Sequence, residues 1–69
     1  MSIYHESILR VALRKLGIAD PDLDGWSLSS EYGGVYRYDC AGLGALHLYH
    51  DDRSIAMVGL YLNGLEVLS

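Results

Sequence analysis

The sequence predicts an α+β domain in which one N-terminal helix packs on a small antiparallel sheet of about four to five strands. Apolar residues near the N-terminus recur at helical spacing, which indicates an amphipathic helix. From Trp26 onward, glycines divide the chain into short runs rich in Tyr, Val, Leu and Ile, which is typical of strands joined by tight turns. The length of 69 residues allows one small core, so we expect residues 1–69 to form a single acidic domain.

The first predicted element is a helix that begins after Ser2 and runs to about Leu16. The Ser2 hydroxyl can cap the first turn, and Gly17 ends the helix. Acidic and basic side chains lie near its start and its end respectively, as the helix dipole favours. The predicted apolar face consists of Leu9, Ala12, Leu13 and Leu16. The following segment, residues 18–25, contains the only proline and is expected to be an ordered loop.

Five strands are expected after this loop, at Trp26–Glu31, Val35–Cys40, Ala45–Tyr49, Ile55–Leu62 and Leu65–Leu68. Gly33-Gly34 and Asn63-Gly64 favour tight hairpin turns, and residues 50–54 favour a polar turn. Gly59 lies inside the longest run and indicates a bulge or a crossing point. That run also fits a short helix capped by Ser54, but we expect a strand.

Alternation along the strands predicts which side chains meet the helix. Leu46 and Leu48 share one face with His50, and this face is expected to pack on the helix. In the longest run, one face is expected to hold Ala56, Val58, Leu60 and Leu62, and the other Ile55, Met57 and Tyr61. One helix covers only one face of such a sheet, so apolar or tyrosine-rich surface is expected to remain for a partner.

The charge and the cysteine content narrow the class of function. Nine acidic residues against five basic ones give a net charge of −4, which disfavours direct nucleic-acid binding and favours basic partners, although surplus acids also simply keep proteins soluble. Cys40 is alone, so no internal disulfide is expected. There is no apolar run long enough to span a bilayer and no secretory signal, so we expect a cytoplasmic protein without a membrane partner.

The motif with the most specific spacing is an acidic one that resembles a calcium-binding EF-hand loop. It consists of Asp20, Asp22, Asp24, Gly25 and Glu31. Alternate carboxylates followed by a glycine and a more distant glutamate supply the hard oxygen ligands that Ca²⁺ prefers. Pro21 occupies the second position of the loop, the Gly33-Gly34 pair disfavours the exiting helix that such a loop needs, and no second EF-hand is present. We expect an acidic loop here and keep a calcium-binding module as an alternative.

Two further groups of residues suggest chemistry but lack a signature. His47 and His50 form H-x-x-H, yet residues three apart on a strand face opposite sides, so a structural or exposed role is expected. Cys40, or Ser54 with His50 and Asp52, could be interpreted as a nucleophile with its base, but no nucleophile elbow, phosphate loop or cofactor fingerprint occurs. We expect neither an enzyme nor a cofactor, and no metal at these histidines.

Six tyrosines and no phenylalanine indicate a surface that binds protein. Tyrosine combines a large ring with a hydroxyl that can stay hydrated or bond to a partner, although several tyrosines are also expected to fill the edge of the core. Tyr36 and Tyr38 are expected on one face, opposite Arg37 and Asp39.

The acidic residues that cluster around the tyrosine-bearing strands are Asp20, Asp22, Asp24, Glu31, Asp39, Asp51 and Asp52. A cysteine-poor acidic domain of this size with this pattern resembles the small phage-encoded anti-CRISPR proteins, most closely the type I-C inhibitors. The resemblance implies a protein that binds the DNA-binding subunit of a type I CRISPR effector complex in the host cytoplasm and places carboxylates where DNA phosphates would lie. It also implies no direct nucleic-acid binding, and we expect a monomer or a weak homodimer. The expected partner-binding residues are Asp20, Asp22, Asp24, Glu31, Tyr32, Tyr36, Tyr38, Asp39, Asp51 and Asp52.

The first four of these acids are expected to form one group and Asp51 with Asp52 a second at a hairpin tip. Lys and Arg grooves of an effector complex hold DNA, and a rigid array of carboxylates can occupy such a groove without catalysis. The nearest alternative is an antitoxin or immunity-type binder of another basic protein that handles nucleic acid.

Overall fold

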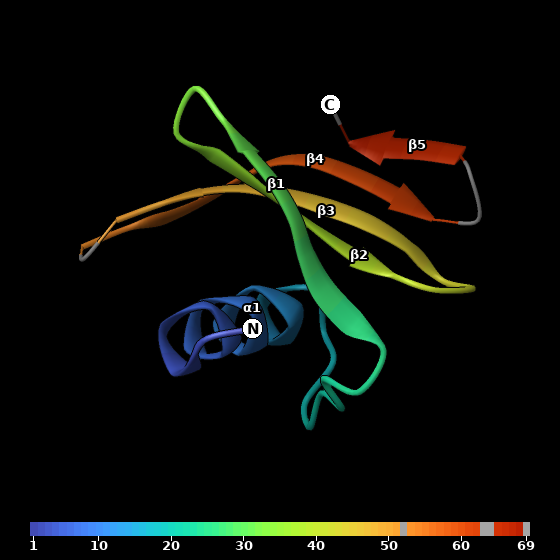
Figure 1. Ribbon diagram of the computed structural model, residues 1–69. Coiled ribbons are helices and arrows are strands. Elements are labelled where there is room, and N and C mark those ends of the chain that lie inside the picture. The colour runs from blue at the N-terminus through green and yellow to red at the C-terminus, as the bar shows by residue number, and fades with distance from the viewer. Residues whose placement is uncertain (52, 63–64, 69) are drawn as a thin grey trace.

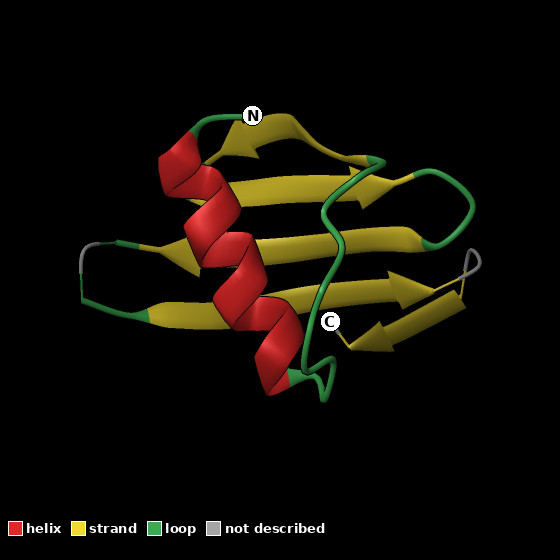
Figure 2. Ribbon diagram, turned by 90° about the horizontal axis from the view of Figure 1, so that it is seen from below, coloured by secondary structure: helices red, strands yellow, loops and turns green. Residues whose placement is uncertain are grey.

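In the described part of the protein, one helix packs on a five-stranded antiparallel sheet, which confirms the α+β prediction (Figures 1 and 2). The computed structural model describes residues 1–51, 53–62 and 65–68. The strands follow one another in the order β1-β2-β3-β4-β5, so each pairs with its neighbour in sequence. The elements are α1 (Ile3–Lys15), β1 (Trp26–Tyr32), β2 (Val35–Cys40), β3 (Gly44–His50), β4 (Ile55–Leu62) and β5 (Leu65–Leu68).

Both ends of α1 have the caps that the sequence predicts. The Ser2 hydroxyl accepts a hydrogen bond from the backbone N–H of His5 at 3.2 Å. At the other end Gly17 has a φ of 96° and donates to the Arg14 carbonyl, while the next N–H, that of Ile18, donates to the Leu13 carbonyl. This pair of hydrogen bonds is a Schellman motif, which ends the helix and turns the chain toward the sheet.

The core lies between α1 and one face of the sheet. Leu9, Ala12 and Leu13 of α1 are buried as predicted, whereas Leu16 is 40% exposed. They pack against buried sheet side chains at Tyr38, Leu46, Leu48 and Leu60. We call this side of the sheet the inner face and the side away from α1 the outer face; α1 crosses only the inner face (Figure 2).

The hairpin that joins β1 to β2 has the predicted turn. Gly33 and Gly34 have φ angles of 59° and 80°, as a type I′ turn requires. The predicted Asn63-Gly64 turn and Asp52 lie outside the described residues. Residues 55–62 form a strand and not the alternative short helix.

The predicted alternation along β4 is wrong in its first half because of a bulge. His47 pairs with Gly59 and the next residue, Leu48, pairs with Met57, so Val58 is an extra residue in β4. The extra residue reverses the side on which the preceding side chains lie. Ile55 and Met57 therefore pack against the core with Leu60, while Ala56 and Val58 are exposed.

Candidate partner-binding surfaces

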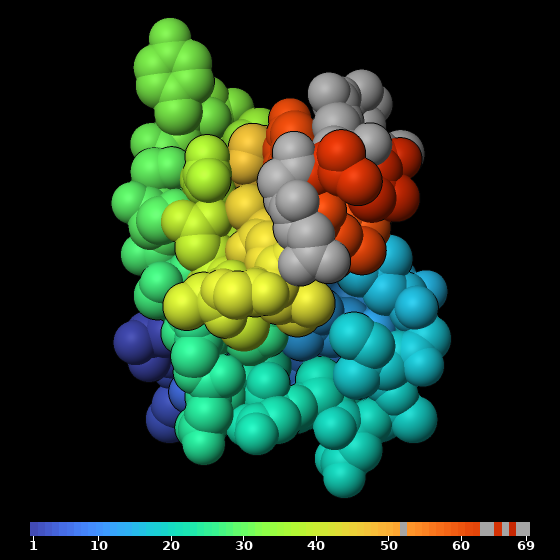
Figure 3. All heavy atoms as spheres, turned by 90° about the vertical axis from the view of Figure 1, so that its right-hand side faces the viewer, coloured from blue at the N-terminus to red at the C-terminus, as the bar shows by residue number. Residues whose placement is uncertain are grey.

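The loop between α1 and β1, residues 18–25, displays three carboxylates and is anchored by the residues between them. Asp20, Asp22 and Asp24 are all exposed, while Pro21 is buried and Leu23 packs partly buried against the core. The Asp22 carboxylate also accepts a hydrogen bond from the backbone N–H of Asp24 at 2.9 Å, which forms an Asx turn. We call this segment the acidic loop; it projects at the lower edge of the molecule in Figure 3.

The other predicted acids do not join this group. Glu31 lies near the far end of β1, and six residues of strand from Gly25 correspond to about 20 Å. The predicted grouping of Glu31 with the three aspartates is therefore wrong, because a strand carries Glu31 away from the loop. Asp51 is at the β3–β4 turn, which projects from the sheet end where Glu31 lies (Figure 1). Asp52 lies outside the described residues.

The same geometry separates the ligands of the EF-hand-like motif. Glu31 pairs with Tyr36 in the sheet, where a calcium loop would need the start of a helix. Within residues 1–51, 53–62 and 65–68, no group of three or more His, Cys, Asp or Glu side chains is placed to hold a metal ion. The structure therefore gives the calcium-binding alternative no assembled site.

The turn after β3 is organised by Asp51. One of its carboxylate oxygens accepts hydrogen bonds from the backbone N–H groups of Arg53 and Ser54, at 2.8 and 2.9 Å, and from the Ser54 hydroxyl at 3.4 Å. These bonds, those of the two backbone groups first, lower the pKa of Asp51 below its ordinary value. Ser54 is thus bonded to Asp51 and does not form the arrangement with His50 that a catalytic triad would need.

Sequence reasoning missed a cluster of aromatic and polar side chains at the end of the inner face next to α1. The tyrosine–histidine cluster consists of Tyr4, His5, Tyr36, Tyr38 and His50. The Tyr38 hydroxyl is hydrogen-bonded to Nδ1 of His5 at 2.7 Å and to Nε2 of His50 at 2.8 Å. Because a phenol carries one proton, Tyr38 donates to one histidine and accepts from the other. The cluster therefore ties the start of α1 to β2 and β3.

Burial shifts the pKa values of two members of this cluster, Tyr38 and His50. Tyr38 is fully buried, and its pKa is raised first by that burial and then by the neighbouring Tyr36 and Tyr4. His50 is only 5% exposed, and burial, followed by repulsion from His5, lowers its pKa. The ring of Tyr36 stacks on that of His50 with centroids 4.3 Å apart. These contacts favour a neutral His50 that stabilises the fold.

The predicted role of Tyr38 in partner binding is therefore wrong, because its side chain has no exposed surface. Tyr36 is half-buried against His50, while Tyr32 at the end of β1 is 90% exposed. The sequence does carry one signal for the cluster. His50 belongs to the face that alternation assigns to the helix, and a polar side chain on such a face needs a hydrogen-bond partner such as a tyrosine hydroxyl.

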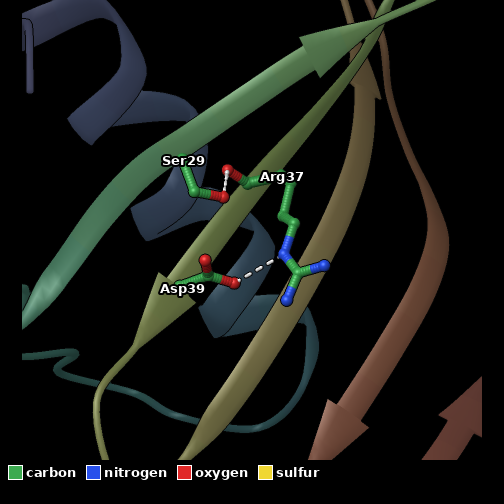
Figure 4. Close-up of polar contacts among 3 residues, drawn as sticks. All are labelled: Ser29, Arg37 and Asp39. Atoms are coloured by element: carbon green, nitrogen blue, oxygen red, sulfur yellow. Dashed lines mark hydrogen bonds and ion pairs between the residues drawn. The ribbon is translucent and has the colours of Figure 1, made fainter.

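The outer face of the sheet carries an ion pair on β2. Arg37 Nε donates to Asp39 Oδ1 at 2.8 Å, and the Ser29 hydroxyl of β1 donates to the Arg37 carbonyl at 3.2 Å (Figure 4). Partial burial raises the pKa of Asp39, but the hydrogen bond from Arg37 and the nearby Ser29 hydroxyl outweigh it and leave that pKa below its ordinary value. Both partners are partly exposed, so the pair itself adds little stability.

Two open hollows lie on either side of Arg37 on this face. One, of about 590 Å³, is lined by Arg37, Asp39, Leu43, Ala45 and Tyr61 among others. The other, of about 340 Å³, is lined by Ser30, Tyr32, Val35, Arg37 and His47. His47 lies over Gly59, its ring is 5.2 Å from that of Tyr61, and its buried Nε2 has no hydrogen-bond partner among the described residues. His47 and His50 thus lie on opposite faces, as the sequence predicts.

Comparison with family models, curated proteins and solved structures finds no match. Over the described part of the chain, α1 is too short and too polar to cross a bilayer, and it is the one helix there. Cys40 is a partly buried free thiol at the end of β2.

Proposed function

We propose that the protein is an inhibitor that binds a type I CRISPR effector complex in the cytoplasm and blocks target DNA binding by acidic DNA mimicry. The observation that supports this proposal is the construction of the acidic loop. Pro21 and Leu23 face the protein while the three carboxylates between and beside them face solvent. The loop therefore offers its charges in a fixed arrangement to a partner.

The charges of the acidic loop are available for an external cation. Among the described residues, the ion pair on the outer face is the one salt bridge, so Asp20, Asp22 and Asp24 have no cationic side chain of their own chain within bonding distance. The Cα atoms of alternate residues are at most about 7 Å apart along a chain, so the three aspartates follow one another in a short row along the loop. A Lys- and Arg-lined groove that holds successive phosphates is a suitable partner for such a row.

The proposal assigns the main contact to the acidic loop and a secondary contact to the opposite end of the sheet. Glu31, Tyr32 and Asp51 lie at that end and are exposed. Inhibition needs no catalytic group, because occupying the groove is sufficient to exclude DNA. The net charge of −4 adds a long-range attraction to a basic partner that raises the association rate and weakens with salt.

The test is a mobility-shift competition between labelled target duplex and rising amounts of the protein, with purified type I effector complex at two salt concentrations. The decisive variant carries Asp20→Asn, Asp22→Asn and Asp24→Asn together. Asparagine retains the side-chain oxygen that accepts from the backbone of residue 24, so the Asx turn is preserved while three charges are removed.

A matched control raises the net charge by the same amount away from the loop, with Ile3→Lys, Ser7→Lys and Val11→Lys at exposed positions of α1. Each lost ion pair costs about 0.5–1 kcal/mol, so the triple Asn variant loses about 1.5–3 kcal/mol and should displace DNA at least about tenfold less well, while the control should remain near wild type. Displacement by wild type should also weaken at high salt. If wild type leaves DNA bound, or if both variants behave alike, the acidic loop is not the inhibitory surface.

A further inference from the structure

The outer face of the sheet is a partly apolar surface that no element of the described chain covers. The helix lies on the inner face only, as Figure 2 shows. Tyr49 and Val58 on the outer side are 43% and 40% exposed, and Val35 and Tyr61 are partly exposed beside them. A sheet with one solvated face is usually polar on that face, so these side chains indicate a surface that meets another protein.

The only ion pair among the described residues lies on the same surface. Arg37 reaches Asp39 through Nε alone, so both Nη groups of its guanidinium and the second oxygen of Asp39 are without an ion-pair partner in the described chain (Figure 4). The pair therefore offers donors and acceptors side by side. A partner that presents an acid and a base in the reverse order can form an ion pair with each of these two residues.

We propose that two copies of this chain pack outer face to outer face about a two-fold axis, with Arg37 of each copy bound to Asp39 of the other. A two-fold interface uses the same patch on both copies, so the patch must be complementary to itself. A neighbouring base and acid on one strand meet this condition, since rotation by half a turn places Arg37 opposite Asp39 and Asp39 opposite Arg37.

Size and shape are consistent with this interface. The molecule measures 30 × 27 × 20 Å, so its broad face approaches the roughly 800 Å² per partner of a standard interface. Two sheets that pack face to face lie about 10 Å apart, which leaves room for interdigitating side chains. The hollows beside Arg37 can take up the exposed tyrosine and valine side chains of the second copy. The dimer does not depend on the proposed inhibitory partner, because the acidic loop lies outside this face.

Charge reversal with complementation tests the dimer. Arg37→Asp gives a face with two acids, and Asp39→Arg gives one with two bases, so each variant alone should dimerise more weakly than wild type because of like-charge repulsion. An equimolar mixture should form a heterodimer, because the two altered faces are again complementary. Arg53→Asp, at an exposed position of the β3–β4 turn, makes the same charge change off the face and should leave the dimer intact.

The measurement is sedimentation equilibrium from about 10 µM to about 1 mM, the range in which a weak homodimer dissociates. Wild type should dimerise, and each single reversal should weaken dimerisation at least about tenfold. Circular dichroism establishes that the variants are folded. The proposal is overturned if wild type stays monomeric, if Arg37→Asp dimerises like wild type, or if the mixture fails to associate while both chains are folded.

A second measurement needs no variant. Amide shifts of the wild-type chain should change with concentration at Arg37, Tyr49 and Val58 and remain constant along α1. Changes confined to α1 or to the acidic loop would place the interface elsewhere and contradict the proposal.

Discussion

Replacing Tyr38 with phenylalanine tests whether the tyrosine–histidine cluster stabilises the fold. The change removes one hydroxyl and keeps the ring, so the packing of Tyr38 in the core is preserved. The hydroxyl that is lost forms hydrogen bonds to His5 at 2.7 Å and to His50 at 2.8 Å. Both bonds link elements that are distant in the sequence, since His5 lies in α1 and His50 ends β3.

Most of the expected loss of stability in Tyr38→Phe comes from the lost hydrogen bond to His50. It is 5% exposed, so its Nε2 would be left buried without a partner, which costs about 1–3 kcal/mol. His5 is only half-buried, and water can replace its lost bond at a cost of about 0.5 kcal/mol. We therefore expect Tyr38→Phe to lower the free energy of unfolding by about 2 kcal/mol. For a domain of this size that corresponds to a fall in Tm of about 8–16 °C.

Urea unfolding followed by circular dichroism measures this difference directly. Tyr32→Phe is the matched control, because Tyr32 is 90% exposed and its hydroxyl has no hydrogen-bond partner in the described part of the chain. The control should lie within about 0.5 kcal/mol of wild type. If Tyr38→Phe is as stable as this control, the hydrogen bonds of the cluster do not hold α1 to the sheet.

Three further predictions concern stability. The pKa of His50 is lowered in the folded state, so as pH falls the unfolded chain binds the proton first. The free energy of unfolding should therefore be highest above the ordinary histidine pKa of 6.5 and decrease as pH falls below it. Urea unfolding at several pH values measures this dependence, and a flat profile would contradict it. A side chain at Gly44 would overlap the backbone carbonyl of Tyr61, so Gly44→Ala should lower the free energy of unfolding by about 3 kcal/mol, as measured by urea unfolding. An unchanged free energy would mean that β3 and β4 separate easily at this position. Asp51→Ala should speed hydrogen exchange at the backbone amides of Arg53 and Ser54, because it removes the oxygen that accepts their hydrogen bonds. Asp51→Asn keeps an acceptor oxygen and should largely preserve their protection. Equal exchange in both variants would refute the role of the Asp51 side chain in ordering the turn.

Most of the fold follows from local rules that the sequence displays. The Ser2 cap, the Gly17 stop and the Gly33-Gly34 turn each act over a few residues, so their effect can be predicted without a structure. The alternation in β2 and β3 was also predictable, because one face of each strand is more polar. In β4 both sides are apolar, so the bulge at Val58 left no mark in the pattern except Gly59.

The candidate surfaces could be predicted only in part. The acidic loop is local, and its alternation of aspartates with Pro21 and Leu23 is visible in the sequence. The position of Glu31 depends on where β1 carries the chain, and an EF-hand-like spacing gives no information on that. The tyrosine–histidine cluster joins residues from α1, β2 and β3, so its contacts exist only once the helix has packed on the sheet.

The central proposal is that this protein and target DNA compete for one groove of an effector complex. The most direct test measures the affinity of the fluorescently labelled protein for the complex, with and without saturating target duplex. Competition is reciprocal, so DNA that fills the groove must weaken binding of the protein by the same factor that the protein weakens binding of DNA. We predict at least about a tenfold loss of affinity for the DNA-loaded complex, or about 1.4 kcal/mol. Equal affinity for the free and the DNA-loaded complex would contradict DNA mimicry.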